Sequence, residues 1–529
     1  MNMKRLIILT FTLSVFLSSF GALNKSVVNL ITYDAEGKLL SNSPAVVCGA
    51  TGEVVAAYSS MKGASSAEVI DCKGKSYKVT RILGASADYD LVRFAVEKGK
   101  KLETAEISVT RDSLCRVWNY SNDKKYEGVK TVITHREKYN DYEYFTLSLP
   151  NESKFFGCPV FDADGRVVAL VQQNVTKNAA TACAIDIKFA QDLKITSSSA
   201  MRDDLREILI PKALPENEED AYSYLYLLSL SSNKQAFYDE AKLMEETYPE
   251  NVEFLTLMAG YQARQKDYAS SEDYFQKALK VGKSADQVHA AYSDVIYEQV
   301  LHGQSSYSDW TLEKALDEAE KAYSERPDTI YYLRQAHCLY GLKRYGEARD
   351  KYVLVARKTP VSSQEIWYYA ARSAEMAGES PENVIVYLDS ALTQFRKPYN
   401  QAAAPYLVAR AQQYEKAGKA RAAVLDYNDY ERAMGPRNLT ANFYYLREQQ
   451  ERKCRMFQQA LDDMDTAMAL AQEQEDKDLY LTEQAAIYLQ VGSFDEAITR
   501  CEKVLKTSPD MDDAKKIIEL ARSHKEGGK

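Results

Sequence analysis

The hydrophobic pattern of the chain changes its period near residue 195. From about residue 25 to 190, short apolar and β-branched runs such as 26–32 and 166–171 are interrupted by polar positions. Glycine and Asp-Gly turns separate these runs, and the pattern predicts strands joined by tight turns. Regularly spaced strands over this length predict a barrel or a sandwich in residues 25–195.

From about residue 219 onward the apolar period is helical, and it repeats. The copy in residues 478–510 carries Leu481, Ala485, Tyr488, Gly492, Phe494, Ala497, Cys501, Val504 and Pro509. Related frames begin near Leu255 and Tyr332, and the spacing from Ala423 to Ala460 and from Ala460 to Ala497 is 37 residues each. Small residues at such positions let two helices approach closely, while large ones fill gaps in the next pair.

These copies resemble tetratricopeptide repeats. The resemblance implies about eight helical hairpins in residues 219–510, with an insertion around 303–310, and a capping helix and tail in 511–529. Between the two stretches, residues 196–218 contain three successive serines and two prolines, and we expect a linker with a short helix there.

The N-terminus has the features of a secretory signal. Lys4 and Arg5 precede an apolar run that ends near Leu17, and small residues follow up to Gly21 and Ala22. We therefore expect residues 1–22 to be a signal peptide, and the protein to be exported to a periplasm, a cell surface or the medium. No later segment is apolar enough for a transmembrane helix. The formal net charge of -9 gives no support to nucleic-acid binding.

Cysteine and histidine usage gives no sign of a metal site. The eight cysteines form no CxxC pair, and the chain has five histidines, of which His135 is the one between 25 and 195. We expect most cysteines to be small buried side chains, and the sequence assigns no disulfide pairs. No cofactor is expected.

Three segments of the first stretch share the spacing of a known protease family. Residues 45–64 carry Gly52 and end in Gly63-Ala64, residues 84–94 carry Asp90 before an apolar run, and residues 154–170 carry Gly157, Pro159 and an Asp-Gly turn. In this order they resemble the HtrA/Deg-like proteases of the trypsin fold. The resemblance implies an all-β double barrel of trypsin type, followed here by an all-α superhelix of tetratricopeptide repeats.

The same resemblance implies that the catalytic triad is degenerate. Asp90 matches the family's aspartate, but Ser59 stands at the histidine position and Phe156 at the nucleophile position, while Lys154 and Cys158 replace two glycines. Acyl transfer requires a nucleophile, a base and an oxyanion hole. Phe156 cannot attack a carbonyl, and a serine hydroxyl is no base at neutral pH. We therefore expect a pseudoprotease rather than an enzyme.

Three functions remain to be compared. The first is a protein-binding scaffold whose repeat groove holds a peptide or protein partner, with candidate groove residues Tyr331, Tyr368, Tyr369, Tyr406, Tyr444 and Tyr445. Each of these tyrosines is also a candidate for the core, because repeat arrays bury aromatic residues between hairpins. The second is an active peptidase with a Cys158/His135 pair. The third is a glycan or nutrient receptor, which requires aromatic platforms beside carboxylates; no such cluster is evident in the sequence.

Overall fold

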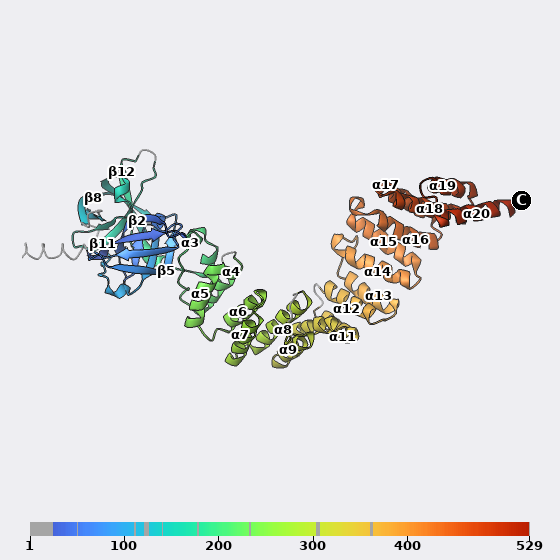
Figure 1. Cartoon of the computed structure of the whole chain (residues 1–529), viewed down its shortest axis with the longest axis horizontal. Helices are drawn as coiled ribbons and strands as arrows, with labels where there is room; N and C mark the ends of the chain where they lie inside the picture. Colours follow the sequence, from blue (N-terminus) through green and yellow to red (C-terminus); the bar gives the residue numbers. More distant parts are fainter. Residues whose placement is uncertain are drawn as a thin grey trace, which may run out of the picture. The chain divides into compact units, whose positions relative to one another are not determined.

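The computed structural model describes residues 25–49, 51–109, 113–120, 126–139, 141–176, 179–231, 234–302, 307–359 and 363–527. The predicted signal peptide, residues 1–22, lies outside these ranges, and so does part of the insertion around 303–310. The chain forms two compact units, one ending at Tyr261 and the other beginning at Gln262. Figure 1 shows strands first along the sequence and helices after them.

The described strands form two closed barrels of six. The first contains β1 (Val27–Tyr33), β2 (Leu39–Val47), β3 (Val54–Ala56), β4 (Ser66–Ile70), β5 (Ser76–Ser86) and β6 (Leu91–Val96). The second contains β7 (Leu114–Tyr120), β8 (Tyr126–Tyr139), β9 (Tyr142–Pro150), β10 (Pro159–Phe161), β11 (Val167–Gln172) and β12 (Thr181–Asp186). The first has the order β1-β2-β3-β6-β5-β4, and the second repeats it as β7-β8-β9-β12-β11-β10.

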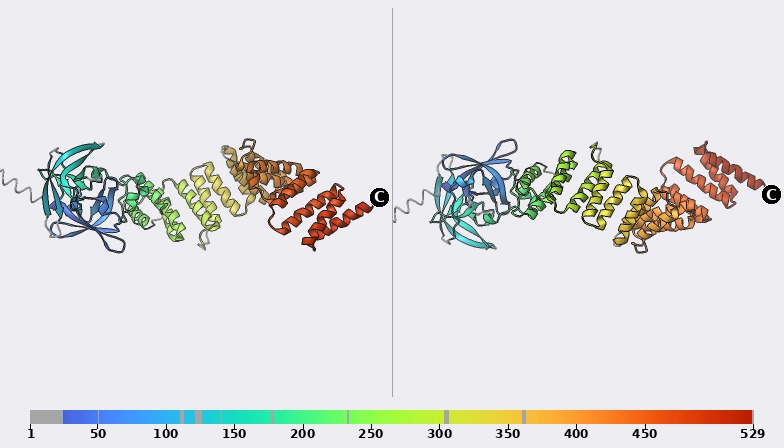
Figure 2. Two further views of the ribbon diagram at one scale, coloured as in Figure 1. Left: turned by 90° about the horizontal axis from the view of Figure 1, so that it is seen from above. Right: turned by 90° about the horizontal axis from the view of Figure 1, so that it is seen from below.

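This duplicated topology confirms the predicted double barrel of trypsin type. Apolar and polar side chains alternate along the strands, so that one face of each strand is buried in a barrel. In β5, Tyr77 and Val79 face inward while Lys78 and Thr80 face solvent. A shared apolar cluster contains Val27 and Leu91 of the first barrel with Phe161 and Leu170 of the second. The two barrels lie side by side in Figure 2, and this cluster fills the space between them.

The segment predicted as a linker is hydrogen-bonded along the first barrel. It contains the 3-10 helix η4 (Ser197–Met201) and the short helix α3 (Asp203–Arg206). Backbone hydrogen bonds join Leu209 N–H to the Ala64 carbonyl (2.8 Å) and Ile82 N–H to the Pro211 carbonyl (2.9 Å). We call residues 196–213 the strap, because they are fixed on the barrel surface along most of their length.

The strap leads into the first helices, which belong to the same unit. These are α4 (Glu218–Ser229), α5 (Lys234–Thr247) and most of α6 (Val252–Arg264). The backbone N–H of Lys212 donates to Glu240 Oε1 (3.0 Å), and Lys212 Nζ donates to the Ile208 carbonyl (2.6 Å). Glu240 is fully buried, and burial raises its pKa. A buried carboxylate on α5 therefore holds the strap against the helices.

The second unit consists of antiparallel helices in succession. They are α7 (Tyr268–Val281), α8 (Ala285–Leu301), α9 (Leu312–Glu325), α10 (Thr329–Gly341), α11 (Tyr345–Lys358), α12 (Gln364–Met376), α13 (Pro381–Leu392), α14 (Ala404–Lys416), α15 (Ala420–Met434), α16 (Ala441–Lys453), α17 (Phe457–Leu470), α18 (Gln474–Gln490), α19 (Phe494–Thr507) and α20 (Asp512–Gly527). Within the described chain, the sixteen helices from α4 to α19 precede the final helix α20, and this agrees with the predicted all-helical region. None of the described helices combines the length and apolar character needed to cross a membrane.

The turns inside the helix pairs share one geometry. Gly378, Gly418 and Gly492 have positive φ at this turn, and so do the non-glycine residues Lys343 and Arg455. In each case the next residue donates its N–H to a carbonyl five positions back, as Ser493 does to Tyr488 (2.9 Å). These bonds define a Schellman motif, which satisfies the last carbonyls of the first helix and turns the chain back.

Polar side chains repeat with the 37-residue period inside the array. Arg410 on α14 makes a bidentate ion pair with Asp426 on α15, and Arg447 on α16 makes the same pair with Asp463 on α17. Both arginines also reach the preceding pair, where Arg447 contacts Glu431 (2.6 Å). The small residues Ala423, Ala460 and Ala497 predicted a spacing of 37 residues, and the buried charge pairs recur with the same spacing.

Candidate functional site

Two sites were expected, one at the degenerate triad and one on the helices. In the first barrel, Ser59 lies in a 3-10 turn (Tyr58–Ser60) that follows β3, and Asp90 precedes β6. Asp90 Oδ1 accepts from the Ser59 N–H (2.7 Å) and Oδ2 from the Ser59 hydroxyl (3.2 Å). Burial raises the pKa of Asp90, while the two bonds from Ser59 lower it. The structure thus brings two of the three triad positions together.

The loop at the nucleophile position approaches the same region. Phe156 follows the 3-10 turn Ser153–Phe155, and its backbone N–H donates to the Ser153 carbonyl (3.1 Å). A β-carbon on the next residue, Gly157, would lie 3.7 Å from Cβ of Ala57, just before the Ser59 turn. The N–H that an oxyanion hole needs at the nucleophile position is therefore already bonded within its own loop.

The alternative Cys158/His135 pair is not brought together. Cys158 is fully buried in the apolar interior of the second barrel, beside Val160 and Ala182, and burial raises its pKa to about 12. His135 is exposed on β8. No contact joins the two side chains among the described residues. Burial of this kind keeps a thiol unreactive, so the geometry does not support the alternative of a catalytic Cys158/His135 pair.

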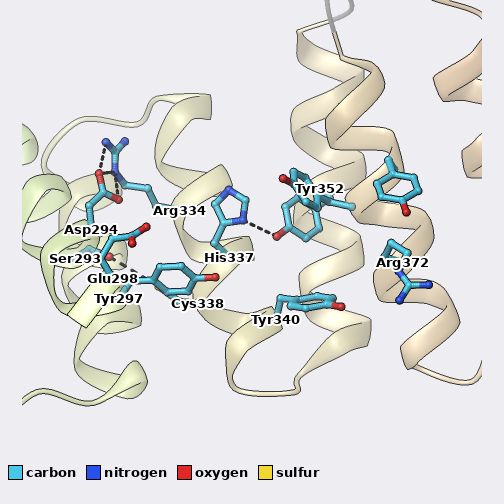
Figure 3. A pocket seen from close by; sticks show the side chains of 12 residues that line it. Ser293, Asp294, Tyr297, Glu298, Arg334, His337, Cys338, Tyr340, Tyr352 and Arg372 are labelled. Carbon is cyan, nitrogen blue, oxygen red and sulfur yellow. Dashed lines mark hydrogen bonds and ion pairs between the residues drawn. The ribbon is translucent and has the colours of Figure 1, made fainter. Parts of the chain in front are cut away.

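A cavity of about 650 Å³ opens on the helical unit (Figure 3). Its walls come from the first helices of three successive pairs, α8, α10 and α12, with Tyr352 from α11. The lining residues are Ser293, Asp294, Tyr297, Glu298, Arg334, His337, Cys338, Tyr340, Tyr352, Tyr368, Tyr369 and Arg372. The lining residues of α8 and of α10 are spaced at i, i+3 and i+4, and residues with this spacing share one face of a helix.

The charged groups around the cavity are largely paired. Arg334 binds both oxygens of Asp294, with Nη2 to Oδ2 at 2.7 Å, and Figure 3 shows this bidentate pair. Arg372 pairs with Glu375 one turn further along α12. Glu298 is exposed and makes no ion pair with any described residue. The lining therefore holds two guanidinium groups and two carboxylates, which sum to zero formal charge.

Aromatic rings surround His337 at the centre of the cavity. His337 Nδ1 lies 2.8 Å from the Tyr352 hydroxyl, and its ring meets Tyr369 edge to face at 5.6 Å. Burial lowers the pKa of His337, so the imidazole is neutral at physiological pH. A neutral imidazole and tyrosine hydroxyls give the cavity an uncharged, hydrogen-bonding centre.

The six tyrosines predicted for the groove fall into three environments. Tyr331, Tyr406 and Tyr444 are 2 %, 8 % and 5 % exposed and lie in the packing between helices, so their predicted place in the groove is corrected. Tyr331, for example, donates its hydroxyl to Asp286 (2.6 Å) in the interior. Tyr368 and Tyr369 do line the cavity. Tyr445 is half-buried and contacts Tyr480 at a ring distance of 5.7 Å.

The sequence interpretation missed most of the cavity. Tyr297 and Glu298 follow Asp294 at i+3 and i+4, and His337 and Cys338 follow Arg334 in the same way. This common face of two consecutive first helices was the available signal. Among the described residues, no group of three or more histidine, cysteine, aspartate or glutamate side chains could hold a metal ion.

Comparison with known proteins finds similar chains among solved structures only. No family model matches the chain, and no curated protein matches it. Among solved structures, it is similar to the HtrA-type protease AlgW with tripeptide, at 15 % identity and a TM-score of 0.29, over 34 % of this chain and 61 % of that one. A serine endoprotease from Yersinia pestis is 12 % identical with a TM-score of 0.29, over 36 % of this chain and 66 % of that one. A protease from M. tuberculosis in its active form is 15 % identical with the same TM-score, over 37 % of this chain and 86 % of that one.

The match thus spans less than two thirds of the AlgW chain. Identities and TM-scores this low add nothing to the topology already described. The duplicated six-strand order defines the class: a double barrel of trypsin type that continues into a helical C-terminal region.

Proposed function

We propose that this chain is an exported binding protein that holds a peptide or protein partner in its helical region and does not cleave it. The observation that carries the proposal is the cavity on α8, α10 and α12. Its volume of about 650 Å³ lies within the range of pockets that bind small ligands or peptide side chains. An extended partner crossing three successive helices would contact residues from all three pairs, as in tetratricopeptide proteins.

The pseudoprotease part of the proposal rests on chemistry at the barrels. Ser59 offers a hydroxyl where a base is needed, and its hydroxyl and N–H are both engaged by Asp90. Phe156 has no nucleophilic atom, and its N–H is bonded to Ser153. The base and the nucleophile therefore lack the chemical group that acyl transfer requires, and the oxyanion hole lacks a free N–H donor at residue 156. The barrel serves as a rigid domain that carries the helices.

Site-specific photocrosslinking tests the binding function. A benzoylphenylalanine at position 369 should capture a partner from the organism's extracytoplasmic extract, whereas the same group at Val386, exposed on α13, should not. The captured band should disappear when unlabelled full-length protein is added in excess. Equal capture from both positions would contradict a specific site at the cavity.

Activity assays test the absence of peptidase function. The mature chain should leave casein intact and should not react with a fluorophosphonate probe, and iodoacetamide should label the exposed thiol of Cys72 but not the buried thiol of Cys158. Cys158→Ala should behave like the wild type in both assays. Cleavage that depends on Cys158 would overturn the pseudoprotease proposal.

A glycan is the second candidate, and one specific observation favours it. The cavity gathers Tyr297, Tyr340 and Tyr369 beside the carboxylates of Asp294 and Glu298, which is the arrangement required above for a glycan site. However, Arg334 already occupies both oxygens of Asp294, which leaves Glu298 as the single free carboxylate in the lining. Oligosaccharide binding that is lost on Tyr369→Ala would favour this candidate.

A further inference from the structure

Two carboxylates line the cavity from α8, and they differ in their partners. Asp294 accepts from Arg334 Nε with both oxygens, at 2.9 Å each. Glu298 lies one turn further along the same face of the helix and is exposed. Among the described residues, no cation pairs with Glu298. The acidic face of α8 therefore has one carboxylate that the chain neutralises and a second that it does not.

Elsewhere in the second unit, a cation, a carboxylate and a tyrosine ring form a trio. Examples of the trio are Lys314 with Glu272 and Tyr292, and Arg500 with Glu496 and Tyr488. In the second example Arg500 Nη1 lies 2.8 Å from Glu496 Oε2, and the guanidinium carbon lies 4.2 Å from the centroid of the Tyr488 ring. The carboxylate attracts the cation through its charge and the ring attracts it through its quadrupole.

Glu298 and Tyr297 are two members of such a trio, and Figure 3 shows them next to each other on α8. Among the described residues, no lysine or arginine lies over the Tyr297 ring. Burial raises the pKa of Tyr297 to about 12, with smaller contributions from Cys338, Glu298, Tyr369 and Tyr340. The hydroxyl of Tyr297 is therefore uncharged at neutral pH, and a ligand at this wall meets one negative charge beside an aromatic ring.

The charges on α12 have the opposite effect. Arg372 lines the cavity there and pairs with Glu375, which also accepts from Lys416 Nζ (2.6 Å). Two cations thus share one carboxylate, and Figure 3 shows Arg372 on the far side of the cavity from Glu298. A basic group is repelled from the α12 side and attracted to the α8 side. The charge pattern therefore selects both the sign of a ligand's charge and its position.

We infer that the cavity receives a basic side chain, arginine or lysine, from a peptide segment of the partner, with its cation at the Glu298 carboxylate and the Tyr297 ring. The inference rests on the proposed binding function and names the chemical group that the cavity selects. A volume of about 650 Å³ holds such a side chain together with part of its backbone. The formal net charge of -9 also favours the approach of a basic segment.

A double-mutant cycle between protein and peptide tests this inference. Fluorescence anisotropy follows the binding of labelled Gly-Ser peptides to the full mature chain, each peptide with one central arginine, lysine, citrulline or glutamate. Citrulline keeps the shape of arginine without its charge. The arginine and lysine peptides should bind about fivefold to tenfold more tightly than the citrulline peptide. Glu298→Gln should weaken the arginine peptide about threefold and leave the citrulline peptide unchanged.

Matched variants control for net charge and for the ring. Glu313→Gln removes the same charge from an exposed position on α9 outside the lining, and it should leave all four affinities unchanged. Tyr297→Phe keeps the ring and should bind the arginine peptide as the wild type does. Tyr297→Leu removes the ring and should weaken that peptide about threefold. If Tyr297→Leu fails to fold, the comparison of Glu298→Gln with Glu313→Gln still decides the test, because both residues are exposed.

The outcomes separate this inference from the proposed function. If the arginine peptide binds no more tightly than the citrulline or glutamate peptide, or if none of them binds, the inference of a basic side chain is wrong. Equal weakening of the arginine and citrulline peptides by Glu298→Gln would contradict an ion pair at this carboxylate. Specific capture at position 369 alongside a failed peptide test would keep the binding function and exclude the basic group. Absence of that capture would overturn the binding function itself.

Discussion

Asp90 accepts hydrogen bonds from both the N–H and the hydroxyl of Ser59, at 2.7 and 3.2 Å, so that one carboxylate holds the whole Ser59 turn. In a trypsin-like triad this carboxylate would orient a histidine. Here it bonds to the residue that stands in place of the histidine. Asp90 also has positive φ (44°), a conformation that asparagine and aspartate tolerate better than most residues.

Asp90 is therefore expected to act on stability and not on catalysis. Asp90→Ala should lower the free energy of unfolding of the barrel by about 1–2 kcal/mol, because the Ser59 N–H loses its acceptor and alanine is strained at this φ. Asp90→Asn keeps an acceptor and a tolerated backbone, and should cost about 0.5 kcal/mol or less. Native-state hydrogen exchange of the barrel amides in the full chain measures both. Equal losses for the two variants would contradict this role.

Restoring two triad residues is expected to leave the barrel inactive. Ser59→His with Phe156→Ser returns a base and a nucleophile, but the N–H of residue 156 remains bonded to the Ser153 carbonyl and Lys154 still stands at a glycine position. Without that donor the tetrahedral intermediate is poorly stabilised, at a cost of about 10²–10³ in rate for each missing bond. Fluorophosphonate labelling measures the outcome. Labelling of the double variant well above that of Ser59→His would mean that the loop reopens.

The strands and helices could be predicted from the sequence because each depends on a pattern of neighbouring residues. Alternating strands such as β5 and the spacing of Ala423, Ala460 and Ala497 depend on neighbours within one or two elements. The double barrel followed from three short motifs in order. The helical pairs followed from the repeat, and their turns from residues such as Gly378, Gly418 and Gly492.

The cavity could not be predicted in the same way, because it depends on which way each helix faces. Tyr331 and Tyr369 are both aromatic residues near the start of a first helix, yet one is 2 % exposed and the other 42 %. Tyr331 is the third residue of α10 and Tyr369 the sixth residue of α12, so the two side chains lie on different faces of their helices, and only the packing of the helices shows which face lines the cavity. The sequence also did not show that the strap is bonded to the barrel. Its prolines indicate only a turn, whereas in the structure the Pro211 carbonyl accepts a hydrogen bond from the Ile82 N–H on β5.

The buried contact between the strap and α5 gives a third prediction. Glu240 is fully buried and accepts the Lys212 N–H, so Glu240→Ala leaves that donor and the buried Lys212 side chain without a nearby carboxylate. Removal of the acceptor of a buried hydrogen bond typically costs about 1–3 kcal/mol, and we expect about 2 kcal/mol here. Glu246→Ala, exposed on the same helix, is the matched control and should change stability by less than about 0.5 kcal/mol. Limited proteolysis within 196–218 should accelerate only in the Glu240 variant.

The helix-pair turns give a fourth prediction. Arg455 is exposed and has φ of 59°, where a β-carbon is strained, so Arg455→Gly should stabilise the α16–α17 pair by about 0.5–1 kcal/mol. The matched control is Gly492→Ala, with φ of 80° and no atom within 4 Å of the added β-carbon, and it should destabilise α18–α19 by about 1 kcal/mol. Native-state hydrogen exchange resolves each pair separately. Slower exchange in Gly492→Ala would contradict the conformational argument.

The fifth prediction concerns the carboxyl groups of Glu448 and Glu451, which are buried on α16. Burial raises the pKa of Glu448 to about 7 and that of Glu451 to about 8, against 4.5 as the ordinary value. Arg452 and Arg447 face them from the same helix, together with Asp463 from α17 and Glu483 from α18. The nearby carboxylates strengthen the preference for the protonated form.

The sign of the pH dependence follows from these raised values. Below about pH 4.5 both groups are protonated in the folded and unfolded chain, and they impose no penalty on folding. As the pH rises toward 8, the unfolded chain releases these protons more readily than the folded chain, so stability falls by about 1.4 kcal/mol for each pKa unit between the two states. Glu448→Gln should flatten this decline and raise the melting temperature at pH 8, while the exposed Glu475→Gln should follow the wild type. Melting of the full chain at pH 5, 6, 7 and 8 measures the slope, and parallel slopes for Glu448→Gln and wild type would show that the buried acid is ionised in the folded protein.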